Sequence, residues 1–322
     1  MTVATSHSPA AAARQESVEP AIEVDHLVKH YPSVKAVDDV SFRVAAGEVF
    51  ALLGPNGAGK TTTTEIVEGL RQPDSGAVRV LGLDALRQAD AIKQRIGIQL
   101  QTTALYQKLT VREIIALFGS FFARALPPDE VIALVSLQEK AETRSKQLSG
   151  GQRQRLAVAI ALVNDPEIIF LDEPTTGLDP QARRRMWEVI ENLRGRGRTV
   201  FLTTHYMEEA ERLCDRVAIM EQGKIIALGS PRELIREHFK YTAIEFATPA
   251  AIDQDALRAL PLVANVEVEN GKTTLYSSGV PQTIEALTRL ATAHGDGLNG
   301  LTVRQATLED VFLQLTGRRI RE

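Results

Sequence analysis

The sequence predicts an α/β fold built around a parallel β-sheet. Three short apolar runs, at 49–53, 168–171 and 199–202, have the length of buried parallel strands. Helical patterns lie between the first two runs, as at Val111–Phe118 and Val131–Leu137. Strands that alternate with helical stretches are typical of a parallel sheet with helices packed on its faces.

The composition is that of a globular protein. The 322 residues are 44% hydrophobic, enough for a buried core, and their number suits two unequal domains. A formal net charge of −4 argues against a general nucleic-acid binder, which needs surplus Lys and Arg, so no nucleic-acid partner is expected. Cys214 is the only cysteine, which excludes an internal disulfide and fits a reducing compartment such as the cytoplasm.

Three regions follow from the pattern along the chain. Residues 1–21 are predicted to be a disordered tail, because they are rich in Ala, Ser, Thr and Pro and poor in large apolar groups. Strand-like alternation begins at Ile22 and opens a predicted α/β domain at 22–239, with a mainly helical subdomain at about 102–163. Residues 240–322 form a predicted C-terminal accessory domain.

No secretory signal and no membrane span are expected. The longest apolar run, Ala157–Val163, is far shorter than the ~20 residues that cross a bilayer. The first twenty residues lack the basic start and long apolar stretch of a signal peptide. Any role at a membrane must therefore come through a partner.

The accessory domain is expected to be a small α+β unit. Its pattern predicts strand 241–247, helix 252–260, strand 263–269, strand 272–277, helix 281–293 and strand 301–305. This order, βαββαβ, is the ferredoxin-like arrangement. A last helix begins after Thr307, which can cap it, and ends at Gly317. Its apolar face carries Leu308, Val311, Phe312 and Leu315.

A glycine-rich loop follows the first apolar run and matches G-x-x-x-x-G-K-[ST] at every fixed position. Glycines let the backbone wrap a phosphate with its N–H groups pointing inward, and the helix that starts there adds its N-terminal dipole. The lysine can neutralise the β- and γ-phosphates, and the threonine hydroxyl can bind Mg²⁺. The loop consists of Gly54, Pro55, Asn56, Gly57, Ala58, Gly59, Lys60 and Thr61, and Thr62 follows in the helix.

This phosphate loop predicts that the chain binds and hydrolyses Mg-ATP. The alternative is a chance glycine-rich turn, which the strand before it and the helix after it disfavour. The loop alone does not distinguish kinases, GTPases and transport ATPases.

Two carboxylates follow the second apolar run. Asp172 ends a predicted core strand, where a carboxylate lies beside the phosphate loop and can hold Mg²⁺ through water. Glu173 should point to the other side, where it can act as general base on the attacking water. His205, near the end of the third run, can contact the γ-phosphate or that water. Taken singly, an acidic pair is more often solvated at the start of a loop, and a histidine at a strand end is more often structural. The shared position of all three residues at neighbouring strand ends favours catalysis.

The segment Leu148-Ser149-Gly150-Gly151-Gln152 precedes a predicted helix at Arg153–Val163. Ser149 can cap this helix, and the two glycines let a phosphate approach its N-terminus. A plain helix cap is the alternative. A second phosphate-binding terminus makes sense if the two termini face different nucleotides.

Over about residues 22–240 the sequence resembles the ATP-binding cassette (ABC) ATPase family. The match rests on the phosphate loop (Walker A), the LSGGQ signature, the acidic pair (Walker B and catalytic glutamate), the switch histidine His205 and the D-loop Gly177-Leu178-Asp179. The Q-loop glutamine aligns best with Gln101, and Gln99 is a weaker candidate. Tyr31 is placed like the aromatic residue that stacks on adenine, with an exposed surface tyrosine as the alternative.

The resemblance implies a P-loop NTPase (ABC ATPase) core with a helical signature subdomain, and it implies roles for the residues. Catalysis falls to Glu173, His205, Lys60 and Gln101. The Mg²⁺ ligands are Thr61, Gln101 and Asp172. ATP contacts come from Tyr31, the phosphate loop with Thr62, Asp179, and the signature residues Ser149, Gly150, Gly151 and Gln152. Two cassettes pack head to tail in this family, so a second copy of the chain or a close paralogue is implied.

The end of the chain resembles the C-terminal extension of ABC-2-type exporter ATPases, the daunorubicin-resistance-like group. The shared stretch is Ala306-Thr307-Leu308-Glu309-Asp310-Val311-Phe312-Leu313. This resemblance implies an energising subunit for export of drugs, lipids or polysaccharide. A separately encoded permease would dock near residues 102–140 and hold the chain at the inner face of the cell membrane.

Other functions fit the residues less well. A cassette ATPase that is not coupled to transport and acts on nucleic acid or ribosomes generally carries paired cassettes or long coiled-coil insertions, and the sequence has neither. A P-loop kinase or GTPase leaves LSGGQ unexplained. A nucleotide sensor without turnover would be expected to lose Glu173 or His205, and both are present.

Overall fold

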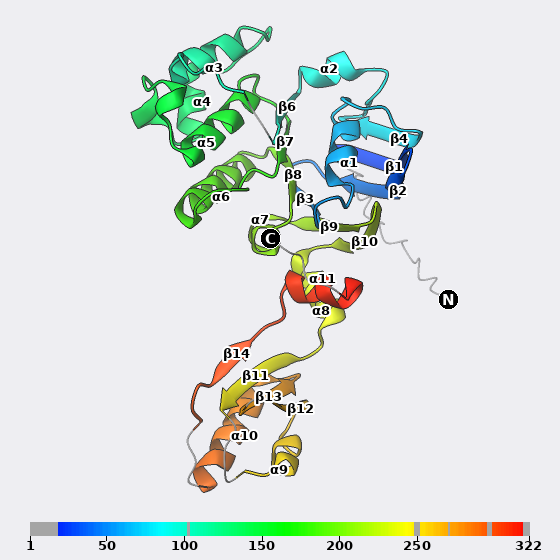
Figure 1. Cartoon of the computed structure of the whole chain (residues 1–322), viewed down its shortest axis with the longest axis vertical. Helices are drawn as coiled ribbons and strands as arrows, with labels where there is room; N and C mark the ends of the chain where they lie inside the picture. Colours follow the sequence, from blue (N-terminus) through cyan, green and yellow to red (C-terminus); the bar gives the residue numbers. More distant parts are fainter. Residues whose placement is uncertain (1–18, 102–103, 248–251, 270, 295–297, 318–322) are drawn as a thin grey trace, which may run out of the picture.

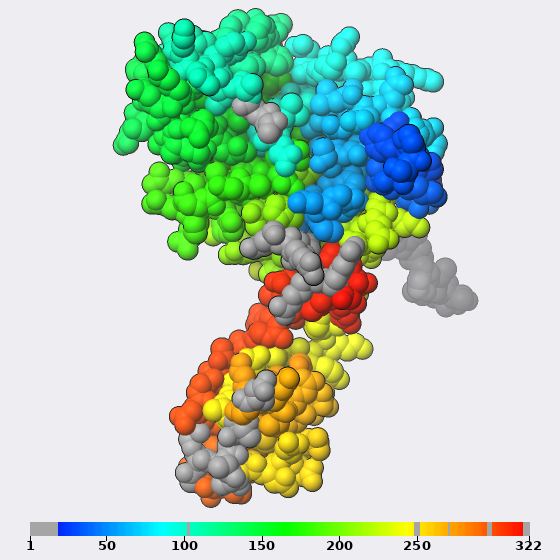
Figure 2. Space-filling view, in the orientation of Figure 1, coloured from blue at the N-terminus to red at the C-terminus, as the bar shows by residue number. Residues whose placement is uncertain are grey.

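The computed structural model describes residues 19–101, 104–247, 252–269, 271–294 and 298–317. Most of the predicted N-terminal tail, residues 1–18, lies outside the described residues, as do residues 102–103 of the helical subdomain. Figure 1 shows two bodies of unequal size along one long axis. Figure 2 shows that a narrow waist joins them.

The larger body contains the predicted parallel sheet. Its six strands follow the order β10-β9-β3-β8-β7-β6, and all neighbours are parallel except β10 and β9. The predicted runs are the adjacent strands β3, β8 and β7, so their carboxyl ends lie along one edge. The strands are β3 (Val49–Leu53), β6 (Ile96–Gln99), β7 (Ile168–Asp172), β8 (Thr199–Thr204), β9 (Arg216–Glu221) and β10 (Lys224–Gly229).

A second sheet covers one side of the first and was not predicted beyond its opening residues. It is antiparallel with the order β2-β1-β4-β5. One core joins the sheets, and within it the ring of Phe50 lies 5.3 Å from that of Phe42 and 5.7 Å from that of Phe201. The same core includes residues of α1 (Lys60–Val67) and α2 (Ala89–Lys93). The strands are β1 (Ile22–Tyr31), β2 (Val34–Val44), β4 (Ser75–Val80) and β5 (Leu83–Asp84).

Helices cover the opposite side of the parallel sheet. Two of them, α3 (Val111–Gly119) and α4 (Pro128–Leu134), confirm the predicted helical stretch, although α4 begins and ends three residues earlier than expected. Pro128 stands at its first position, where a missing N–H costs no hydrogen bond. The other helices here are α5 (Gly150–Ala161), α6 (Pro180–Gly195) and α7 (Met207–Leu213), with short 3₁₀ turns at Gln138–Lys140 and Ser145–Gln147.

The smaller body has the predicted element order βαββαβ. Its sheet is antiparallel with the order β12-β13-β11-β14. A separate core lies between this sheet and its helices, around Ile244, Phe246, Leu275 and Leu287. The elements are β11 (Thr242–Ala247), α9 (Gln254–Arg258), β12 (Val263–Glu269), β13 (Lys272–Ser277), α10 (Val280–Ala293) and β14 (Thr302–Arg304).

Two helices lie at the waist, α8 (Pro231–His238) and α11 (Leu308–Thr316). The predicted caps of α11 are confirmed, because the Thr307 side chain accepts from a backbone N–H and Gly317 ends the helix in the left-handed conformation. The sequence places α11 in the C-terminal region, yet its buried side chains join the core of the larger body. Leu308 N also donates to Glu211 on α7. The last helix therefore packs with α7 and α8.

Candidate active site

The phosphate loop joins β3 to α1 at the carboxyl edge of the parallel sheet. Gly57 and Gly59 have φ values of 82° and 103°, which L-residues with side chains rarely adopt. A Cβ on Gly59 would lie 2.2 Å from the carbonyl oxygen of Ala36. Both conformation and space therefore require glycine at position 59.

Lys60 begins α1, and its side chain reaches back into the phosphate loop. Its side chain is only 5% exposed, and Nζ donates to the carbonyl oxygens of Gly54 and Pro55 at 2.8 and 3.1 Å. Burial lowers the pKa of Lys60, and the nearby carboxylates Glu173 and Asp172 partly oppose this effect. The loop thus holds a buried ammonium group where a phosphate binds in proteins with this motif.

Asp172 is the last residue of β7 and is 8% exposed. It accepts a hydrogen bond from the hydroxyl of Thr203 on β8, which fixes the carboxylate at the strand end. Burial is the main cause that raises its pKa. Thr61, a second predicted Mg²⁺ ligand, lies exposed in the first turn of α1.

Glu173 is the point where the predicted catalytic residues meet. Its backbone has φ 45°, and its N–H donates to the carbonyl oxygen of Thr203 at 3.2 Å. Its Oε1 lies 3.4 Å from His205 Nδ1 and 3.7 Å from Lys60 Nζ. Its Oε2 accepts from Gln101 Nε2 at 3.4 Å.

The pKa of Glu173 is lowered to about 2, chiefly by the interaction with His205 and further by Lys60 and Thr176. The hydroxyl of Thr176 donates to Oε2 at 3.1 Å. The carboxylate is therefore ionised at neutral pH and can accept a hydrogen bond from a water molecule.

The two candidate glutamines have different environments. Gln99 is 1% exposed, and its Nε2 donates to the carbonyl oxygen of Leu100 at 2.6 Å. Gln101 is exposed and reaches Glu173. The structure thus brings Gln101 to the Glu173 carboxylate, whereas Gln99 donates to the backbone at the end of β6.

The signature residues lie apart from this cluster. In Figure 1, α5 and α1 lie on opposite sides of β7 and β8. The cap predicted for Ser149 is confirmed, because its hydroxyl accepts from Gln152 N at 3.3 Å, while Gln152 Oε1 accepts from Ser149 N. A Cβ on Gly151 would lie 2.6 Å from that of Ala182, so glycine lets α5 approach α6. A Cβ on Gly150 would meet no described atom within 4 Å.

Two further predicted nucleotide contacts are also outside the cluster. Asp179 accepts from Ala182 N at 2.8 Å and so caps α6. Tyr31 is 37% exposed at the end of β1, with the guanidinium of Arg71 5.7 Å from its ring centre. An exposed ring of this kind can stack on a base.

Two hydroxyl residues of the site, Thr203 and Thr176, are not among the residues predicted from the sequence. Thr203 orients Asp172, and Thr176 contacts Glu173. The available signal was their position, since each stands at or near the carboxyl end of a core strand.

Comparisons with known proteins agree with this architecture. A family model described as ABC transporter matches residues 37–176. The Nod factor export ATP-binding protein I of Paraburkholderia xenovorans is 42% identical over 315 residues, covering 94% of this chain and 99% of that protein. The protein of the same name from Sinorhizobium fredii is 41% identical over 309 residues, covering 94% of this chain and 88% of that protein.

Solved structures show the same fold. The cbiO1 protein of Clostridium perfringens, part of the ABC transporter complex cbiONQ, has a TM-score of 0.62 at 28% identity and covers 68% of this chain and 92% of that chain. An ATP-binding cassette solved as a dimer in a post-hydrolysis state with ADP and Pi has a TM-score of 0.59 at 27% identity, covering 65% and 98%.

The parallel sheet, its phosphate loop and the carboxylates at its edge define a P-loop ATPase. The chain belongs to the ABC transporter family. Within this family it is an ATP-binding subunit, an ATPase whose hydrolysis of ATP serves transport. No helix among the described residues is both long enough and apolar enough to span a bilayer.

Proposed function

We propose that two copies of this chain form a head-to-tail dimer around two ATP molecules and power an ABC-2-type exporter. One observation supports the head-to-tail dimer. Glu173, Lys60, Gln101 and His205 gather in one cluster, while the signature helix lies elsewhere with its Gly150 open to approach. A phosphate held by one protomer would meet Gly150 of the other.

ATP hydrolysis in this dimer needs little covalent chemistry from the protein, because positioning and charge stabilisation supply most of the rate. Lys60 leaves the carbonyl oxygens of its loop and binds the terminal phosphates. Glu173 then loses a nearby positive charge, so its pKa rises from about 2 and it becomes a stronger base toward the attacking water. His205 holds the opposite side of that carboxylate.

Mg²⁺ fits the oxygen groups present at the strand edge. Asp172 and Thr61 offer a carboxylate and a hydroxyl, and the exposed Gln101 offers an amide oxygen. Mg²⁺ in such enzymes is usually held by one or two carboxylates together with substrate phosphates. When bound, it neutralises charge that develops on the phosphates.

Complementation between two inactive variants tests the dimer. Lys60→Ala removes the phosphate lysine, and Ser149→Arg blocks the signature, so each homodimer should be inactive. A mixed dimer retains one intact site, made from Lys60 of one protomer and Ser149 of the other. A one-to-one mixture should regain about a quarter of wild-type ATPase activity if the protomers pair at random. No recovery in the mixture would contradict the head-to-tail site.

Glu173→Gln tests the catalytic carboxylate separately. It should bind ATP, hydrolyse little and accumulate as a dimer in gel filtration, because the general base typically contributes about 10²–10⁴ in rate. A monomer with normal turnover would contradict the assignment.

The export function is supported by the relatives, whose names refer to Nod factor export. We propose that a separate permease docks on the helical subdomain and holds the chain at the inner face of the membrane. A hollow of about 760 Å³ there runs from Leu105 to Gly150 and Gly177. Phe121, which follows α3 in the same subdomain, is 66% exposed. A permease segment docked in this hollow would contact both Leu105 and the signature helix.

Membrane association tests the docking surface. Phe121→Asp should release the chain into the soluble fraction, because a charge on an apolar contact must be desolvated. Leu262→Asp, which changes a 48% exposed leucine of the smaller body, is the matched control. Equal membrane recovery of both variants would contradict this docking site.

For the smaller body we propose the ferredoxin-like arrangement. The element order βαββαβ and the strand order β14-β11-β13-β12 support it. We also propose that this domain spans about 240–306, and that α11 belongs with the ATPase domain at 22–239, since their side chains share one core.

A further inference from the structure

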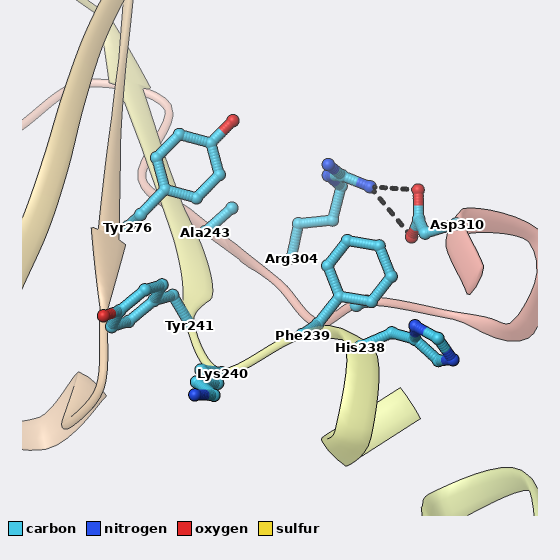
Figure 3. A pocket seen from close by; sticks show the side chains of 9 residues that line it. His238, Phe239, Lys240, Tyr241, Ala243, Tyr276, Arg304 and Asp310 are labelled. Carbon is cyan, nitrogen blue, oxygen red and sulfur yellow. Dashed lines mark hydrogen bonds and ion pairs between the residues drawn. The ribbon is translucent and has the colours of Figure 1, made fainter. Parts of the chain in front are cut away.

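A cleft lies where the two bodies meet, away from the ATP site. The chain passes between the bodies twice, once after α8 and once before α11. These two segments border a hollow of about 320 Å³ whose lining includes Phe239, Lys240, Tyr241, Tyr276 and Arg304. Figure 3 shows Tyr276 and Tyr241 on one side of this cleft and Phe239 and Arg304 on the other.

The aromatic walls of the cleft are held in place by contacts outside it. Tyr276 Oη donates to Glu267 at 3.0 Å. Phe239, the residue after α8, packs against the core of the larger body. Tyr241 is 46% exposed. Tyr276 and Phe239 are thus held on facing walls, and rings held in this way favour a planar ligand, which can stack between them at little entropic cost.

Two cations, Lys240 and Arg304, line the cleft together with one carboxylate, Asp310. Arg304 is already paired with Asp310 and Glu245, so its charge is compensated. Lys240 is exposed and forms no ion pair with any described residue. A second hollow of about 390 Å³ shares Phe239 and Tyr241 with the first. Its charged lining residues are Arg232, Arg236 and Glu211, and neither arginine forms an ion pair with a described residue.

We propose that this cleft binds a small planar aromatic molecule that carries an anionic group. The rings would stack on the ligand, and Lys240 would pair with its negative charge. An aliphatic anion would leave the rings uncovered, and a neutral aromatic ring would gain nothing from Lys240.

Binding at this cleft would reach the ATP site through α11. Asp310 of α11 lines the cleft, and Leu308 at the start of α11 donates to Glu211 of α7. Helix α7 begins two residues after His205, which contacts Glu173. We infer that an occupied cleft changes the rate of ATP hydrolysis. This second step rests on the proposed active site, whereas binding itself does not.

Isothermal titration of the full chain, saturated with Mg-ADP to fill the nucleotide site, tests the binding. The probes are 2-naphthoate and its neutral analogue 2-naphthamide, which share one ring system and differ in charge. We expect 2-naphthoate to bind about tenfold more tightly than 2-naphthamide. Lys240→Glu should weaken 2-naphthoate about tenfold, and Tyr276→Leu about fivefold.

Matched controls are Lys108→Glu and Tyr106→Leu, which change an exposed lysine and an exposed tyrosine of the helical subdomain. They should stay within about twofold of the wild type. Equal affinity for both probes, or equal effects of cleft and control variants, would overturn the site. If Tyr276→Leu does not fold, the comparison of Lys240→Glu with Lys108→Glu still tests the site.

Steady-state ATPase assays test the coupling. Saturating 2-naphthoate should change the wild-type rate at least about twofold and should leave Lys240→Glu unaffected. Binding without any change in rate would refute the coupling and leave the site in place. Failure of the proposed ATPase dimer would show instead as a lack of turnover before any probe is added.

Discussion

A buried carboxyl group at the end of α1 gives a prediction about stability and pH. Glu68 ends α1 and is 3% exposed. Burial raises its pKa to about 8 from an ordinary 4.5, and the charges of Asp172 and Glu65 raise it further in the same direction. We consider the change Glu68→Gln, which keeps the shape of the side chain and removes its ability to ionise.

The direction in which stability changes with pH follows from the proton that Glu68 binds in the folded state. Between pH 4.5 and about 8 the folded protein holds a proton on Glu68 that the unfolded chain releases, so stability falls as the pH rises through this window. The full shift, at about 1.4 kcal/mol per pKa unit, corresponds to at most about 5 kcal/mol of lost stability above pH 8. Glu68→Gln does not lose this stability, so its advantage over the wild type should grow with pH.

Thermal unfolding at pH 5, 6.5 and 8.5, without nucleotide or Mg²⁺, measures this difference. The first unfolding transitions of variant and wild type should nearly coincide at pH 5, and at pH 8.5 the variant should unfold up to about 10–20 °C higher. Glu139→Gln, which removes an exposed carboxylate that forms no ion pair with any described residue, is the control for the loss of one surface charge. A difference between Glu68→Gln and wild type that is the same at every pH would refute the reasoning.

Three other changes test parts of the fold. Gly59→Ala should abolish binding of a fluorescent ATP analogue, because its Cβ would lie 2.2 Å from the Ala36 carbonyl oxygen; normal affinity would show that the loop adapts. Trp187→Phe removes the N–H that donates to buried Glu209 at 3.1 Å, and urea titration should show a loss of about 1–3 kcal/mol. An unchanged midpoint would mean that another donor replaces it. Phe312→Ala, at a side chain 1% exposed, should cost about 3–5 kcal/mol and lower the melting temperature, whereas no shift would contradict the packing of α11.

The parallel sheet and the phosphate loop could be predicted because their signals are local. Buried parallel strands are continuous apolar runs, and the loop has a fixed spacing. The antiparallel sheet has weaker signals. In β1 the register against β2 shifts between Val24 and Leu27, where His26 has φ 49°. Such a bulge interrupts the alternation by which a half-buried strand is recognised.

The candidate site also contains residues that could be predicted from local signals and residues that could not. Residues at the ends of apolar runs, such as Asp172 and His205, could be predicted from their positions. Gln99 and Gln101 stand two residues apart, so strand alternation alone does not distinguish them. The choice depends on where β6 ends, because Gln99 is its last residue and Gln101 lies beyond it. The packing of α11 on α7 could not be predicted, because the contact joins residues about a hundred positions apart.

With α11 assigned to the ATPase domain, as proposed above, the smaller domain is an insertion rather than a tail. Both of its ends are anchored in the ATPase domain, after α8 and before α11. A chain cut at residue 240 would lose α11 as well and expose the apolar surface of α7 and α8 that it covers. A chain in which a short flexible linker joins residue 239 directly to residue 307 would keep that surface covered. Evolution could therefore exchange this domain for another without rebuilding the ATPase beneath it.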